Sequence, residues 1–281
     1  MVSGRRNCLL AGVIDGAAPL VSSRGLPLGE TAGSLVSELI KESIMSADSN
    51  QSLKSMLLDA NRRIRHASLY YGVDYARPET MWAAAASLVR LNSAGNLEYA
   101  HIADTTILVA GTERGDVLTR NQVYSFDCNI FLAMYEARRR GILDPDGQVA
   151  FARTEMIAQK ALANAPKGAG YGAINGMEEN RIEEYIEEGS IKMNNEVRFV
   201  ALLTDGMLPP PTKIGESPDW QHIVSILRWN GLEGLFFHTR QIEESDPWLK
   251  LPRVKNHDDA TGVLIHLHGN TSVPVMPLMT R

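Results

Sequence analysis

The chain of 281 residues has 44% hydrophobic residues and a formal net charge of −5, which is ordinary for a globular protein. Acidic and basic residues are mixed along the chain, so it lacks the basic stripe typical of nucleic-acid or anionic-membrane binding, and we expect neither partner. No apolar run reaches the roughly 18 residues of a membrane span, and the first residues lack a secretory pattern, so we expect a cytoplasmic protein. Cys8 and Cys128 lack metal-type spacing, so we expect both thiols to be reduced.

The first part of the chain predicts a buried strand followed by two helices. Residues 8–14 (CLLAGVI) form a short, nearly unbroken apolar run, and the turn-forming dipeptide Asp15-Gly16 follows directly. Apolar residues then recur at helical spacing over residues 31–45 and again over residues 53–64. We therefore expect a strand that ends in a carboxylate and two consecutive amphipathic helices.

The next stretch of the chain is typical of β-strands. Residues 82–91, 97–103 and 105–110 are β-prone, and the sequence Ser-Ala-Gly-Asn at residues 93–96 is a turn signal between the first two. We expect these three strands to form an antiparallel meander.

The second half predicts further helices and strands in blocks. Helical patterns cover residues 129–140, 149–163, 220–229 and 232–243, while residues 197–204 and 261–267 are typical of strands. Such blocks favour an α+β architecture with antiparallel sheets over the strict βαβ alternation of a parallel sheet. No Pro-, Gly- or Ser-rich linker divides the chain, so we expect one domain over residues 1–281 with an irregular tail at residues 269–281.

Aspartates stand at the ends of the expected strands. Asp15, Asp104 and Asp205 each follow an apolar strand, and Asp258 precedes the strand that begins near Thr261. One Asp-Gly pair alone favours an ordinary turn, but converging strand ends would gather these carboxylates. Their oxygens suit Mg²⁺ or Mn²⁺ better than zinc or copper. Two such ions activate water for in-line attack at phosphorus, so we expect no catalytic group beyond the metal-bound water.

The order and context of these segments resemble the metal-dependent PPM (PP2C-type) serine/threonine protein phosphatases, particularly bacterial members, over nearly the whole chain. GVIDGA at residues 12–17 and GETAGSLVSELI at residues 29–40 resemble the DG motif of that family and its first helix. AHIADTTILVAG at residues 100–111 is similar to the hairpin that carries a GDSR-like element. VALLTDGM at residues 200–207 resembles the strand that ends in SDG, and residues 240–267 resemble the C-terminal segment with its DN or DD pair.

This resemblance implies a fold and a set of metal ligands. The implied fold is a four-layer α-β-β-α sandwich of two antiparallel sheets flanked by helix pairs, with metals in a channel at one edge. The implied ligands for two or three Mg²⁺ or Mn²⁺ ions are Asp15, the Gly16 carbonyl, Asp205 and Asp258, with Asp104 at a third ion.

A basic residue near the last of these aspartates is a candidate for binding substrate. Arg253 and Lys255 both precede Asp258 closely, and a guanidinium can bind phosphate through two hydrogen bonds. We assign the substrate contact to Arg253.

The sequence also departs from the family pattern. The family's N-terminal arginine and its R-x-x-NEDA-like strand have no counterpart, so we expect an N-terminally shortened domain. Ala17-Ala18-Pro19 stands where the family has His-Gly-Gly or Met-Gly-Gly, so a histidine general acid is missing there.

Three functions follow as hypotheses. The first is hydrolysis of phosphoserine and phosphothreonine in protein substrates. The second is an inactive pseudophosphatase that binds a partner, which the missing first motif favours. The third is a phosphoesterase for small molecules, because attack by an activated water does not itself require a protein substrate. The sequence leaves the oligomeric state open.

Overall fold

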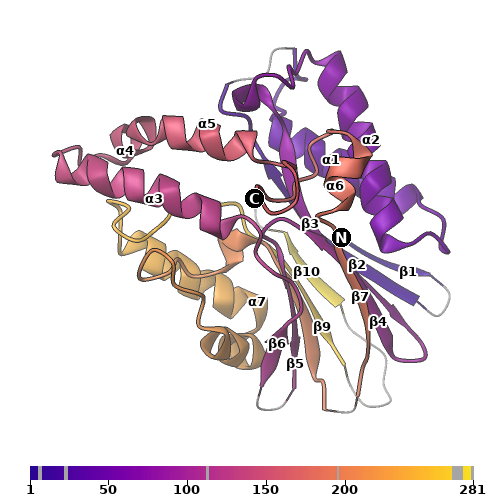
Figure 1. Cartoon of the computed structure of the whole chain (residues 1–281). Coiled ribbons are helices and arrows are strands. Elements are labelled where there is room, and N and C mark those ends of the chain that lie inside the picture. Colours follow the sequence, from indigo (N-terminus) through magenta and orange to yellow (C-terminus); the bar gives the residue numbers. More distant parts are fainter. Residues whose placement is uncertain (6–7, 22–24, 112–113, 195, 268–274, 280–281) are drawn as a thin grey trace.

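The computed structural model spans the chain and describes every residue except 6–7, 22–24, 112–113, 195, 268–274 and 280–281. Its strands form two antiparallel sheets (Figure 1). The first sheet, in spatial order, consists of β1 (Val2–Arg5), β2 (Cys8–Ala17), β3 (Ala83–Asn92), β4 (Asn96–Ile102) and β7 (Glu187–Lys192). The second consists of β10 (Val275–Met279), β9 (Thr261–His266), β8 (Phe199–Leu203), β5 (Thr106–Ala110) and β6 (Gly115–Val117).

The two sheets pack against each other through one apolar layer. Alternate strand residues point to opposite faces of a sheet. Ala11 and Val13 of β2 therefore share this layer with Val200 and Leu202 of β8. The neighbouring positions on β2 and β8 face outward, toward helices. Both faces of each sheet are thus covered, which explains the nearly continuous apolar runs at residues 8–14 and 199–203.

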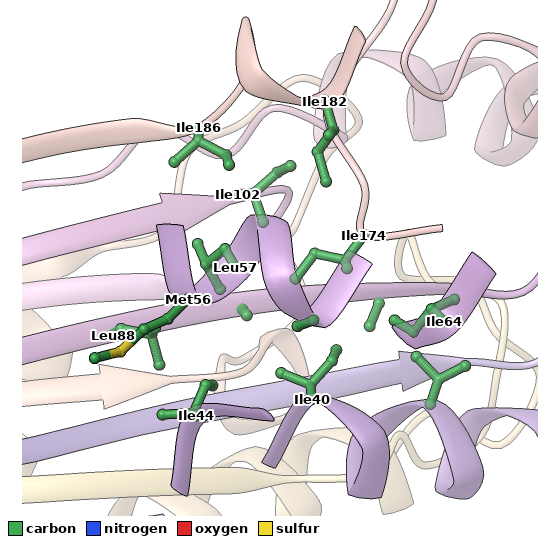
Figure 2. Close-up of a cluster of buried hydrophobic side chains, with 14 of the residues drawn as sticks. Ile40, Ile44, Met56, Leu57, Ile64, Leu88, Ile102, Ile174, Ile182 and Ile186 are labelled. Atoms are coloured by element: carbon green, nitrogen blue, oxygen red, sulfur yellow. The ribbon is translucent and has the colours of Figure 1, made fainter. Parts of the chain in front are cut away.

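Helices α1 (Ala32–Ser46) and α2 (Leu53–Tyr70) cover the outer face of the first sheet. The α1 helix begins at a capping box, in which Thr31 and Ser34 each accept the backbone N–H of the other. Figure 2 shows Ile40 of α1 and Leu57 of α2 in one cluster with Leu88 of β3. Complete burial of each such side chain stabilises the fold by roughly 1.5–3 kcal/mol.

Helix α7 (Trp220–Glu244) covers the outer face of the second sheet. Gly231 interrupts it with φ 66° and ψ −163°. The chain folds back there, because the rings of His222 and His238 lie 5.0 Å apart on the two halves. The two helices expected over residues 220–229 and 232–243 are therefore confirmed. Among the described residues, no helix is long and apolar enough to cross a membrane.

Helices α3 (Tyr124–Arg139), α4 (Pro145–Phe151) and α5 (Arg153–Ala161) extend to one side of the sandwich (Figure 1). The helix expected over residues 149–163 is instead two helices that meet at Ala152, and the first begins earlier because Asp144 caps it. The shorter elements are η1 (Pro78–Thr80), α6 (Glu179–Glu183) and η2 (Asp205–Met207). Together the layers confirm the α-β-β-α sandwich with two antiparallel sheets.

Two sequence expectations about strands were wrong. The three-strand meander does not form, because β5 leaves the first sheet and pairs with β8, while β7 takes the place beside β4. The expected irregular tail contains a strand, β10, which pairs with β9 at the sheet edge, where a proline such as Pro277 is tolerated. Residues 269–274 and 280–281 of that tail lie outside the described residues.

Candidate metal centre

The strand register brings the four predicted aspartates to the same end of the sandwich. Asp15 lies near the end of β2, opposite Ala85 of β3. Asp104 lies between β4 and β5, where the chain crosses from one sheet to the other. Asp205 follows β8, and Asp258 precedes β9, its antiparallel neighbour. The site is therefore built from residues at the same end of both sheets.

Two glycines allow neighbouring segments to approach the carboxylates closely. A Cβ on Gly16 would lie 2.1 Å from the carbonyl oxygen of Gly33 in α1. A Cβ on Gly206 would lie 2.2 Å from the carbonyl oxygen of Asp259. Both contacts are with backbone atoms, which cannot move aside easily. The Asp-Gly pairs at residues 15–16 and 205–206 thus reflect tight packing around the site, and not free surface turns.

The carboxyl groups of Asp15 and Asp205 are within hydrogen-bonding reach of each other. Burial raises the pKa of Asp15 well above its usual value, and the charges of Asp205 and Asp104 raise it further. Burial also raises the pKa of Asp205, followed by the charge of Asp258. The Asp205 residue nevertheless keeps surface exposed to solvent. Two adjacent negative charges repel each other, so the closeness of these two carboxyls adds to the free-energy cost of ionising both.

Asp104 sits in a crossover held by a buried polar network. Ala103, just before it, has a φ of 76°. This left-handed conformation costs roughly 1–2 kcal/mol for a residue with a side chain. After it, Thr105 Oγ1 lies 2.7 Å from Ser87 Oγ and 3.2 Å from His101 Nδ1. The other ring nitrogen of His101 lies 3.0 Å from the Arg120 carbonyl oxygen, to which it can donate. This network fixes the backbone on both sides of Asp104.

The electrostatic environment of Asp104 is similar to that of Asp15. Burial raises its pKa well above the usual value, and the charges of Asp205 and Asp127 add to the shift. The buried His101 beside it has a lowered pKa, because burial disfavours the imidazolium. The centre therefore combines carboxyl groups whose ionisation is disfavoured with a buried histidine that supports the backbone around Asp104.

Asp127 joins this group, although the sequence analysis did not single it out. It lies in the first turn of α3, and Gln159 of α5 donates a hydrogen bond to its carboxylate. Burial raises its pKa to about 7, with the charge of Asp205 as the second cause. The helix predicted from the sequence begins at residue 129, so that prediction leaves Asp127 outside it. The sequence signal that could have identified Asp127 is its spacing of four from Phe131, which places both residues on one helix face. Phe131 is buried in the structure.

The two basic residues near Asp258 have different roles. Lys255 Nζ lies 2.5 Å from Asp258 Oδ1. Partial burial acts to lower the pKa of Lys255, but Asp258, Asp205 and Asp15 together raise it. Arg253, the predicted substrate contact, instead forms an ion pair with Asp246 at 2.6 Å, and both side chains are only 9% exposed. Its guanidinium also donates to the carbonyls of Glu243 and Asp246. These contacts tie Arg253 to the end of α7 and to the start of the loop that follows it.

The donor chemistry of the site fits a divalent cation. Asp15, Asp104, Asp127 and Asp205 are crowded carboxyl groups with raised pKa values, and the charge of Asp205 contributes to the shift of the other three. The single ammonium group of Lys255 offsets these charges only in part. Oxygen donors of this type suit Mg²⁺ and Mn²⁺. Among the described residues, however, no three His, Cys, Asp or Glu side chains are already arranged to hold an ion. A metal ligand must be deprotonated, so ion binding at these carboxyls would depend on pH.

The fold matches solved protein structures, whereas no protein-family model and no curated protein matches the sequence. A serine/threonine phosphatase of Mycobacterium tuberculosis, PstP/Ppp, aligns with a TM-score of 0.52 and 13% identity over 96% of this chain and 92% of that one. The serine/threonine phosphatase Stp1 of Staphylococcus aureus aligns with a TM-score of 0.51 and 13% identity over 93% and 85%. The PstP catalytic domain in complex with two manganese ions aligns with a TM-score of 0.50 and 12% identity over 94% and 88%. The chain therefore has the fold of the PP2C-type phosphatases.

Proposed function

We propose that this chain is a metal-dependent phosphatase that hydrolyses phosphoserine and phosphothreonine in proteins. The observation that carries the proposal is the convergence of Asp15, Asp104, Asp205 and Asp258 from separate segments to one end of the sandwich. The fold it shares with serine/threonine phosphatases, one of which is described in complex with two manganese ions, supports the same conclusion.

Each residue of the centre has a defined task in this proposal. Asp15, the Gly16 carbonyl, Asp205 and Asp258 would hold two Mg²⁺ or Mn²⁺ ions, and Asp104 would help to hold a third. When bound, such ions lower the pKa of water and neutralise phosphate oxygens. Asp15 and Asp205, whose pKa values are raised, must be ionised to serve as ligands, so ion binding would favour their deprotonated forms. The ammonium group of Lys255 lies beside Asp258, where it can attract the dianionic phosphate.

The decisive experiment measures hydrolysis of p-nitrophenyl phosphate and of a phosphothreonine peptide with Mn²⁺, Mg²⁺ or EDTA. We expect activity only with a metal, and we expect Asp205→Asn to remove it, because Asp205 interacts with both Asp15 and Asp258. Asp146→Asn, on the exposed first turn of α4, is the matched control and should keep full activity.

The outcome also separates the two alternative functions. Absence of turnover with every metal, in a folded protein, would favour an inactive binding module. Turnover of sugar phosphates that exceeds turnover of phosphopeptides would favour a small-molecule phosphoesterase.

A further inference from the structure

A pocket of about 320 Å³ lies along α3, C-terminal to Asp127 on that helix. Its wall on α3 includes Phe131, Tyr135 and Arg138. The opposite walls are residues 212–214, in the loop after β8, and residues 249–253, in the loop after α7. We call it the α3 pocket.

The α3 pocket has an apolar floor and a partly apolar rim. Phe131, Met134 and Leu249 are buried there. Tyr135 and Leu132 at the rim are 52% and 53% exposed, which is high for large apolar side chains. A pocket of this volume is at the small end of ligand sites and accommodates one large side chain with part of its backbone.

The helix geometry relates the α3 pocket to the metal centre. Asp127, Phe131, Tyr135 and Arg138 recur at spacings of four, four and three, so they follow one face of α3. Eight residues separate Asp127 from Tyr135, which corresponds to about 12 Å along the helix axis. An extended peptide covers that distance with three to four residues. The loop at residues 249–253 also continues directly to Lys255 and Asp258.

The charges around the pocket favour an anionic occupant. Arg138, Lys213 and Lys250 line it, and within the described part of the chain none of the three forms an ion pair. By contrast, Arg139 and Arg140, which lie outside the pocket, both pair with Glu136.

The contacts of these three cations leave their charge available. Arg138 donates to the Leu249 carbonyl and lies over the Tyr135 ring. Lys213 interacts electrostatically with the exposed Glu216, without closing an ion pair. The side chains around the apolar floor thus include three cations, so this pocket is locally positive although the net charge of the protein is −5.

We infer that the α3 pocket binds the protein substrate at a bulky apolar residue next to an acidic residue, three to four positions from the phosphorylated one. This inference rests on the proposed function. The apolar side chain fills the floor, and the carboxylate lies among Arg138, Lys213 and Lys250. The phosphorylated residue then reaches the centre beside Asp127, because the connecting peptide spans about 12 Å.

The test compares phosphothreonine peptides that carry Leu-Glu three to four positions from the phosphate, on one side or the other, with peptides that carry Ala-Lys there. We expect a higher kcat/KM for one of the Leu-Glu peptides. In Lys213→Glu/Lys250→Glu, the ratio of its kcat/KM to that of p-nitrophenyl phosphate should fall about tenfold. The control Lys192→Glu lies at the opposite end of the sandwich and should leave this ratio unchanged. Equal use of all peptides, or an unchanged ratio in the double variant, would overturn the inference.

A binding measurement separates this inference from the proposed function. Fluorescence anisotropy with the unphosphorylated Leu-Glu peptide needs no turnover, so it remains informative if the protein hydrolyses nothing. We expect salt-sensitive binding that weakens in the double variant but not in Lys192→Glu. No binding up to about 1 mM peptide, or binding of octanoate as tight as that of the peptide, would refute a peptide-binding role.

Discussion

At the scale of single residues, the site is dominated by carboxyl groups whose ionisation costs free energy. Burial and mutual repulsion raise the pKa of Asp15, Asp104, Asp127 and Asp205. A carboxyl with a raised pKa stabilises the fold fully below its unfolded pKa, and this contribution is lost as the pH rises through its folded pKa. The metal-free protein therefore carries an electrostatic cost at neutral pH that a divalent cation would offset.

Asp127 gives a direct test of this cost. Its pKa rises from 3.8 to about 7 on folding, so its contribution is lost between these pH values. In EDTA, Asp127→Asn should be more stable than the wild type at pH 8 by up to about 4 kcal/mol, and the difference should shrink toward pH 5. Urea unfolding at several pH values measures this, with the exposed Asp146→Asn as control. Parallel pH profiles for wild type and Asp127→Asn would contradict the shift.

The buried ion pair of Arg253 makes a second prediction at this scale. Removal of its guanidinium leaves the Asp246 carboxylate, which also accepts N–H groups of Lys250 and Leu251, without its cation. Arg253→Ala should therefore cost about 3–5 kcal/mol of the free energy of unfolding.

The matched control is Arg139→Ala, which breaks an exposed pair with Glu136 and should cost less than about 1 kcal/mol. Similar losses in the two variants, measured by urea unfolding, would mean that Arg253 is not a structural residue and would reopen its role in substrate binding.

At the scale of elements, close backbone packing shapes the centre. The short helix η2 carries Asp205 and Gly206, and Gly206 touches the segment that carries Asp258. On the other sheet, Gly16 at the end of β2 touches α1 at Gly33. Small residues at these two contacts let helices and loops come close enough to hold the aspartates in place.

Gly206→Ala tests whether this contact positions Asp258. The new methyl group would meet the Asp259 carbonyl oxygen, so the segment must shift, which we expect to lower Mn²⁺ affinity at least about tenfold and stability by about 1–3 kcal/mol. Gly115→Ala on β6 meets the buried side chain of Val224 in the apolar core instead and is the control. It should affect stability alone. Isothermal titration with Mn²⁺ measures the affinity and urea unfolding measures the stability, and an unchanged affinity in Gly206→Ala would contradict the prediction.

At the scale of the whole molecule, the centre spans two sheets that pack through a single apolar layer. Asp15 and the segment before Asp104 belong to the first sheet, while Asp205 and Asp258 belong to the second. A cation held by both groups would therefore link the sheets and stabilise the folded state as a whole.

Metal binding should consequently raise the stability of the whole protein. At a free Mn²⁺ concentration 100-fold above the Kd, the free energy of unfolding should increase by about 2.7 kcal/mol. Calorimetry or thermal denaturation measures this without any turnover. The shift should disappear in Asp205→Asn and persist in Asp146→Asn. An unmoved transition in the wild type would argue against a metal centre in this chain.

The sequence by itself determined the local structure, because hydrophobic periodicity and Asp-Gly turns are properties of neighbouring residues. It predicted β2, β3, β4, α1 and α2 and placed Asp15, Asp104, Asp205 and Asp258 at strand ends. The layered fold was predicted from the family resemblance and confirmed by the structure.

Only the tertiary structure decided which segments meet. It moved β5 into the second sheet, added β10 to the expected tail, and brought Asp127 to the centre. It also paired Arg253 with Asp246 and Lys255 with Asp258, although these two cations are only two positions apart in the chain. The physical reason is that strand pairing joins residues far apart in the chain, and that ion pairing within a loop depends on how the loop folds. Periodicity shows which face of an element is apolar but not what that face will meet.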